Sequence, residues 1–275
     1  MTLNNSTQKY GNDYVYVNPS SGGAYKGYYL SLAASGLISS TLPLFSKPFM
    51  KQVPKEHANN ELYRDYLDKA LEKSGLKKQG VRFVHEEMPK FKVNMQYVEN
   101  ADTKAGLNAF YKPAEKTIHI NKDKICIAGF HEIGHAMNHL QSKFGKALQK
   151  MRGIGYTVSG IMGMIALISN RKPRDEKRGV MSFLQDNCAK ITFISMLPLV
   201  IEEALATHKG LKLAKQSGMK ALEMKHLKKF YGKALLTYIG RTLVTTAGVW
   251  VTNKIMDKFT RPKKVYINPN WETQA

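Results

Sequence analysis

The chain has 275 residues, which is long enough to bury a substantial hydrophobic core, and its formal net charge is +21. The basic residues are spread along the chain rather than gathered in an aromatic-rich patch, so we expect no nucleic-acid partner and instead a surface that faces anionic lipid. Its two cysteines, Cys126 and Cys188, match neither a disulfide framework nor a metal-binding spacing.

The N-terminal part of the chain predicts a tail followed by a membrane anchor. Residues 1–25 are rich in Asn, Ser, Gly and Tyr, and we expect a mobile polar tail without a signal peptide. Residues 27–46 carry no charge and, as a helix, are long enough to cross about 30 Å of hydrocarbon. Because Ser, Thr and Gly are frequent in this segment, an interfacial or core-buried segment is the alternative.

A small region of mixed helix and strand is expected next. Residues 59–75 have the apolar spacing of an amphipathic helix, and residues 81–84 and 91–97 are typical of short strands. Residues 106–111 and 117–121 flank a turn signal and predict a β-hairpin. Because this hairpin leads directly into the next helix, one of its strands should lie at the edge of the site, where a substrate backbone could add to it.

The most informative stretch is His131-Glu132-Ile133-Gly134-His135, in a helix expected to begin near residue 123 and to continue past His139. Residues i and i+4 share a helix face, so His131 and His135 can converge on one metal ion, and Glu132 can reach a water bound to it. Zinc suits this arrangement because a catalytic zinc site uses three protein ligands and leaves a fourth position for water. His139 shares the face, and we expect it at the rim of the site rather than among the ligands.

Two further apolar segments follow this helix. Residues 153–170 are uncharged and membrane-like, residues 171–190 predict a charged loop, and residues 191–201 are a second apolar run. Together they predict an apolar hairpin that returns the chain to Glu202 and Glu203. A membrane span needs about 20 apolar residues, so a shallow hairpin packed on the domain is the alternative.

Either of these two glutamates could supply the third metal ligand. On a helix their side chains point about 100° apart, so only one should face the metal. Glu203 is followed by the small residue Ala206 three positions on and by the polar residue Thr207 four positions on. This register resembles that of gluzincin metallopeptidases, and we favour Glu203 over Glu202.

The C-terminal part begins with a basic amphipathic stretch, residues 209–233, and continues with the apolar segment 234–253. The apolar segment contains a single charge, Arg241, which must either line the site or extend to the membrane surface. Residues 261–275 predict a polar tail. We therefore expect one domain, residues 26–260, between two polar tails.

The ordered motifs resemble those of the bacterial membrane-bound neutral zinc metallopeptidases, the YugP-like group of the gluzincin class, and more distantly those of the HtpX and CAAX-protease family. The stretches that carry the resemblance are Asn108-Ala109-Phe110, residues 131–136, residues 203–211 and residues 234–238. Thr207 stands where the HtpX-type pattern has aspartate, which favours the YugP-like group.

This resemblance implies a mainly helical α+β, zincin-like fold, with a small β-hairpin or sheet beside the metal helix and two to four apolar, membrane-associated helices. It implies a zinc endopeptidase that acts on peptides or proteins. In such an enzyme His131, His135 and Glu203 bind Zn²⁺, Glu132 is the general base, and the edge strand with Asn108, Ala109 and Phe110 binds substrate. Candidate donors to the oxyanion are His208, Tyr238 and Arg241.

Two other functions fit parts of the sequence. A membrane-anchored, non-catalytic scaffold would use zinc for structure only and would need a fourth protein ligand, such as His139 or Cys126. A nucleic-acid-binding protein would rely on the positive charge alone. We favour the peptidase, in a membrane, with its active site on the cytoplasmic side because that side carries more Lys and Arg.

Overall fold

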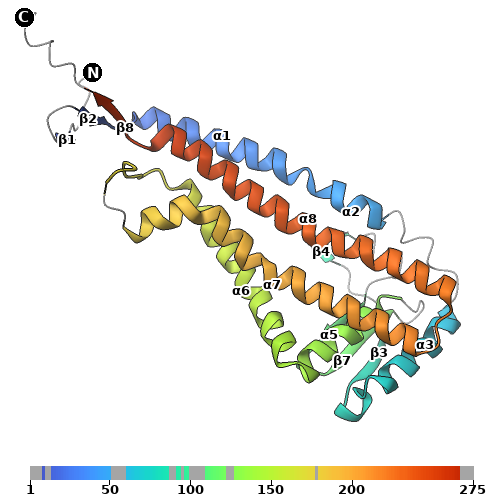
Figure 1. The fold of residues 1–275 in the computed structure, drawn as a ribbon. Coiled ribbons are helices and arrows are strands. Elements are labelled where there is room, and N and C mark those ends of the chain that lie inside the picture. Colours follow the sequence, from blue (N-terminus) through green and yellow to red (C-terminus); the bar gives the residue numbers. More distant parts are fainter. Residues whose placement is uncertain are drawn as a thin grey trace, which may run out of the picture. The chain divides into compact units, whose positions relative to one another are not determined.

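The computed structural model describes residues 8–9, 14–50, 60–86, 91–93, 96–98, 109–121, 127–176 and 179–266. These residues are mainly helical with small β-sheets, so the mainly helical α+β class is confirmed (Figure 1). The chain forms two compact units where we expected one domain. Unit 1 contains Met1–Thr41, Tyr156–Ser195 and Leu243–Ala275, and unit 2 contains Leu42–Gly155 and Met196–Thr242.

The main sheet of unit 2 has the strand order β3-β7-β6, formed by β3 (Arg82–Glu86), β7 (Thr117–Asn121) and β6 (Ala109–Lys112). Strand β7 pairs parallel with β3 and antiparallel with β6, which confirms the predicted hairpin. Strand β6 is therefore at the edge of the sheet. Helix α5 (Gly129–Gln141), which carries the histidines, contacts both β6 and β7.

Apolar residues at helical spacing build the core of unit 2. Helix α3 (Asn60–Lys73), helix α5 and the first turns of helix α8 (Ala221–Thr260) each contribute one apolar face. These buried side chains include Tyr63, Tyr66, Leu67, Phe130, Ile133, Leu227, Phe230 and Tyr231.

Two smaller elements complete this part of the chain. The short helix η2 (Lys77–Gln79) leads into β3. The predicted strand 91–97 is instead two paired strands, β4 (Phe91–Val93) and β5 (Gln96–Val98).

The long helices differ from the sequence expectation in their extent. Helix α6 (Lys143–Leu167) begins ten residues before the predicted segment 153–170, and helix α7 (Val180–Gln216) contains most of the predicted loop 171–190 as well as residues 191–201. The loop prediction was wrong from Val180 onward because it rested on charge. A charged residue is compatible with the helix there because it forms an ion pair: Asp186 Oδ1 lies 2.6 Å from Arg261 Nη2.

The predicted tails also contain regular structure. Strand β2 (Tyr14–Val17) pairs antiparallel with β8 (Lys263–Tyr266) and with β1 (Gln8–Lys9). The tail predictions 1–25 and 261–275 are therefore wrong for these strands, whose pairing joins segments far apart in the sequence. Residues 267–275 lie outside the described chain.

Unit 1 buries a small apolar cluster together with several polar residues, and it exposes large apolar residues. The cluster consists of Met162, Ile165, Ala166, Cys188 and Val249. Helix α1 (Ser21–Ser39) lies along the C-terminal part of α8, where Ser31 Oγ donates to the Thr252 carbonyl at 3.4 Å (Figure 1). Other buried polar residues of this unit are Ser159, Thr192 and Asn253, whereas its exposed apolar residues include Tyr25, Tyr29, Leu37, Met164, Val180, Ile194 and Trp250. Two segments are long and apolar enough to cross a membrane: Gly22–Pro48, which contains most of helix α2 (Leu42–Met50), and Ala221–Thr260.

Helices α5 and α7 approach each other closely in unit 2 at Gly134 and Ala206. A Cβ atom at Gly134 would lie 2.1 Å from the Ala206 carbonyl oxygen, so only glycine fits. One turn further along α7, Gly210 makes a similar approach to the Phe130 carbonyl, where a Cβ atom would lie 2.5 Å away. The crossing is thus set by small residues on both helices.

We predict that Gly134→Ala lowers the free energy of unfolding by about 1–3 kcal/mol or more, because the new methyl group overlaps the backbone of α7. The matched control is Gly232→Ala in α8, where a Cβ atom has no neighbour within 4 Å and alanine should stabilise the helix by up to about 1 kcal/mol. Thermal unfolding of the detergent-solubilised proteins measures both effects. Equal stability of the two variants would contradict the close crossing.

Candidate metal centre

The start of helix α5 is fixed by a tyrosine from α8. Tyr231, 2 % exposed, donates its hydroxyl hydrogen to the Ile127 carbonyl at 2.7 Å and accepts the His131 backbone N–H at 2.9 Å. The same N–H also donates to the Ala128 carbonyl at 2.9 Å, so the hydroxyl is its second acceptor and ties the first turn of α5 to α8. The helix begins at Gly129, later than the residue near 123 that the sequence suggested.

The two histidines of α5 and one glutamate of α7 converge. Glu203 Oε2 lies 3.0 Å from His131 Nε2 and 3.7 Å from His135 Nε2. In a tetrahedral zinc site with bonds of about 2.0–2.1 Å, two ligand atoms are about 3.3 Å apart. The observed separations lie on either side of that value, so Glu203 lies within reach of an ion bound by either histidine. The groups whose ligand atoms all lie close enough together to hold one ion are His131, Glu132 and His135, and His135, Glu202 and Glu203.

The second ring nitrogen of each histidine also has a partner. His131 Nδ1 lies 3.1 Å from Thr207 Oγ1, and His135 Nδ1 lies 2.8 Å from Glu202 Oε1. A hydrogen bond at Nδ1 fixes the ring orientation and leaves Nε2 as the metal-binding atom. The two adjacent glutamates thus differ in position: Glu203 faces the Nε2 atoms, and Glu202 supports one ring from behind.

Glu202 is fully buried and satisfied by side chains from two helices. Its Oε1 accepts hydrogen bonds from Asn138 Nδ2 and Gln149 Nε2, each at 3.0 Å, in addition to the bond from His135. Arg152 Nη1 donates to its Oε2 at 2.8 Å, and Arg152 Nη2 forms an ion pair with Glu203 Oε1 at 2.6 Å.

Sequence reasoning missed Arg152, Gln149 and Asn138 as parts of the site. Gln149 and Arg152 lie on α6, a helix that the sequence expectation began only at residue 153. Their spacing of three residues on one helix face was the one available signal.

Glu132 lies beside the histidines and is also in contact with the edge strand. It is 8 % exposed, and its Oε2 accepts the Tyr111 backbone N–H at 2.9 Å. The Tyr111 hydroxyl lies 3.0 Å from His139 Nδ1, so His139 contacts the strand rather than the histidine pair. Strand β6 therefore orients the carboxylate that the sequence assigns as the base.

The pKa values of His135 and Glu202 describe a buried charge pair in the metal-free protein. Burial by itself would lower the pKa of His135, but the hydrogen bond to Glu202 and the surrounding carboxylates raise it to about 9. Burial would raise the pKa of Glu202, but its hydrogen bonds, above all the one from His135, lower it to about 2.

The pKa values of Glu203 and Glu132 are shifted in opposite directions. Burial would raise the pKa of Glu203, but its hydrogen bond with His131 and the nearby positive groups hold it below its usual range. Burial raises the pKa of Glu132, and the histidines oppose this only in part. Glu132 is therefore the most basic of the three carboxylates, as a proton acceptor requires.

The remaining predicted site residues are distributed around this centre. Ala109 and Phe110 lie on β6, whereas Asn108 lies outside the described residues. Tyr238 contacts Glu203 and lines a cavity of ≈ 300 Å³ together with Arg241. His208 is exposed, one residue beyond Thr207 on α7.

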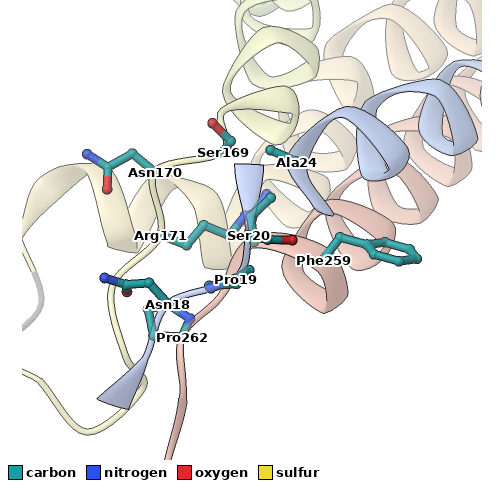
Figure 2. A pocket seen from close by; sticks show the side chains of 10 residues that line it. Asn18, Pro19, Ser20, Ala24, Ser169, Asn170, Arg171, Phe259 and Pro262 are labelled. Carbon is teal, nitrogen blue, oxygen red and sulfur yellow. The ribbon is translucent and has the colours of Figure 1, made fainter. Parts of the chain in front are cut away.

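A second cavity, of ≈ 260 Å³, belongs to unit 1 at the start of α1 (Figure 2). Arg171 lines it, but the guanidinium is buried and already bound: Nη1 donates to Asn253 Oδ1 at 2.9 Å and Nη2 to the Ala166 carbonyl at 2.8 Å. We therefore assign this arginine to the packing of unit 1.

Comparison with known proteins yields no relative: no family model, no curated protein and no solved structure matches the chain. The arrangement of the side chains is therefore the basis for inferring the chemistry of the site. That geometry shows His and Glu groups that could hold a metal ion, with three carboxylates and two imidazoles in a largely buried position.

We predict that the metal affinity of the apoprotein rises about tenfold per pH unit until pH about 9, because binding must displace the proton that His135 holds below its pKa of about 9. Competition with a chelator, in buffers from about pH 6 to pH 9, measures this dependence. The Glu202→Gln variant lacks the carboxylate that does most to raise the pKa of His135. In this variant the metal affinity should therefore stop rising at a lower pH. An affinity independent of pH in the unmodified protein would contradict the prediction.

Proposed function

We propose that the protein is a zinc-dependent endopeptidase located in a membrane. The observation that carries this proposal is the convergence of His131 Nε2, His135 Nε2 and Glu203 Oε2, with Nδ1 of each imidazole held by a neighbour. Two imidazoles and one carboxylate are the ligand set of many catalytic zinc sites, and they favour zinc over magnesium or calcium, which prefer oxygen ligands.

Each side chain has a separate part in the proposed reaction. His131, His135 and Glu203 would hold the ion, which when bound supplies a Lewis acid for the peptide carbonyl and lowers the pKa of water. Glu132 would accept a proton from the attacking water and deliver it to the leaving amine. Its raised pKa and its hydrogen bond from the Tyr111 N–H support this assignment.

Strand β6 and the cavity lined by Tyr238 would bind the substrate. The strand lies at the sheet edge, and Ala109 and Phe110 precede the residue that touches the base, so an extended peptide added there would lie beside Glu132. Tyr238 lines the cavity of ≈ 300 Å³ and contacts Glu203, which makes it our preferred donor to the oxyanion over Arg241 and the exposed His208.

The surface of unit 1 supports a membrane location. Its helices bury Ser and Thr hydroxyls beside one small apolar cluster and expose many large apolar side chains, as helices that face lipid do. A lipid bilayer would cover these side chains and leave the buried hydroxyls to join the helices. The positive charge of the chain would favour anionic lipids, and the cytoplasmic orientation of the site stays a prediction.

We predict that Glu132→Gln retains bound zinc but cleaves fluorescein-labelled casein about 10²–10⁴-fold more slowly, because the amide cannot accept the proton. Zinc content by atomic absorption and the cleavage rate are measured on the same samples. The matched control, Glu72→Gln, removes an exposed carboxylate of α3 and should leave both quantities unchanged. Zinc-dependent folding of the wild-type protein without any cleavage would support the non-catalytic scaffold instead.

We predict that Trp250, which is 52 % exposed in α8, lies in contact with lipid. Trp271→Phe leaves Trp250 as the one tryptophan of the chain. In reconstituted vesicles its fluorescence should be quenched by lipids brominated on the acyl chains and only weakly by iodide in the buffer. Strong quenching by iodide with none by brominated lipid would contradict a membrane location for unit 1.

A further inference from the structure

Arg152 of α6 is the cation that joins the two adjacent glutamates of α7. Its Nη1 lies 2.8 Å from Glu202 Oε2, and its Nη2 lies 2.6 Å from Glu203 Oε1. The Nη1 contact is a hydrogen bond and the Nη2 contact is an ion pair. Because the guanidinium is planar and rigid, the two contacts together hold both carboxylates relative to each other. A lysine could not hold both in this way.

The two oxygens of Glu203 therefore have different surroundings. Oε2 lies toward the imidazoles, 3.0 Å from His131 Nε2 and 3.7 Å from His135 Nε2. Oε1 lies against the guanidinium of Arg152. A carboxylate without such a partner can coordinate a metal ion through one oxygen or through both.

The arginine is itself held in place through Glu202. That carboxylate is fully buried and accepts hydrogen bonds from His135, Asn138 and Gln149, so it has little freedom to turn. Arg152 is anchored to it at Nη1 while its side chain stays 30 % exposed. Glu202 thus supports His135 directly and Glu203 through the arginine.

We propose that Arg152 is a positioning residue that restricts Glu203 to coordination through Oε2 alone, which leaves a position of the metal ion open. This inference rests on the proposed metal binding at His131, His135 and Glu203. Because catalysis by zinc requires an open position for water or substrate, the arginine would decide whether the bound ion is active.

The alternative is that Arg152 only neutralises buried charge. Two substitutions separate the roles: Arg152→Lys keeps the charge but can reach only one carboxylate at a time, and Arg152→Gln removes the charge. If neutralisation were the whole role, the lysine variant would behave as wild type. If positioning is the role, both variants should release Glu203 Oε1.

The experiment uses Co²⁺ bound to the full-length protein in detergent. Four-coordinate Co²⁺ absorbs visible light more strongly than five-coordinate Co²⁺, so the intensity of the spectrum reports how Glu203 binds. We expect a strong spectrum for wild type and a weak one for Arg152→Gln and Arg152→Lys, with Co²⁺ still bound. Casein cleavage by the zinc forms of both variants should fall about 10–100-fold.

The matched control is Lys150→Gln, which removes a positive charge from an exposed position of the same helix and should keep the wild-type spectrum. A wild-type spectrum in both arginine variants, or a weak spectrum in the wild type itself, would overturn the inference while the metal site stands. Absence of Co²⁺ binding by the wild type would overturn the metal proposal and this inference together. A spectral change without casein cleavage by any form would overturn the peptidase proposal alone.

Discussion

The close crossing of helices α5 and α7 is the constraint on which the candidate site depends. Gly134 has no side chain, and the Ala206 backbone occupies the space that a Cβ atom would need. On α7 the residues Glu203, Ala206 and Gly210 are spaced three and four apart, so the ligand and the two small residues share one face. The same face that allows the helices to approach therefore also presents the carboxylate to the imidazoles.

The charges at the crossing explain why these residues need one another. Glu132, Glu202 and Glu203 are each at most 8 % exposed, and burying a carboxylate without a partner is costly. In the metal-free protein Arg152 and the protonated His135 each form ion pairs with both Glu202 and Glu203, and His135 must give up its Nε2 proton to bind a metal ion. A divalent cation together with this arginine would balance three carboxylates, which is a physical reason for a metal ion at this place.

The two units differ in which side chains they bury and which they expose. Unit 2 has a large apolar core around Phe130 and Ile133. Unit 1 has a smaller apolar cluster, buries Ser31, Thr192 and Thr252 as well, and exposes large apolar side chains. A helix surface of this kind is stable when lipid rather than water is the solvent. The candidate metal centre belongs entirely to unit 2, so its geometry does not depend on where unit 1 is located.

Local patterns in the sequence determined the features that depend on residues close together in the chain. The spacing of His131 and His135 placed two imidazoles on one helix face, and the alternating residues around the 112–115 turn gave the β6–β7 hairpin. Only the tertiary structure decided the rest, because it depends on contacts between distant segments. The fold places Glu202 against Nδ1 of His135 and Glu203 against the Nε2 atoms of both histidines. It also brings Arg152 to the two carboxylates, and it pairs Asp186, which was expected in a loop, with Arg261. The register of Ala206 and Thr207 already favoured Glu203 over Glu202 as the residue facing the histidines, but the place of Glu202 behind His135 follows only from the packing of Gly134 against Ala206.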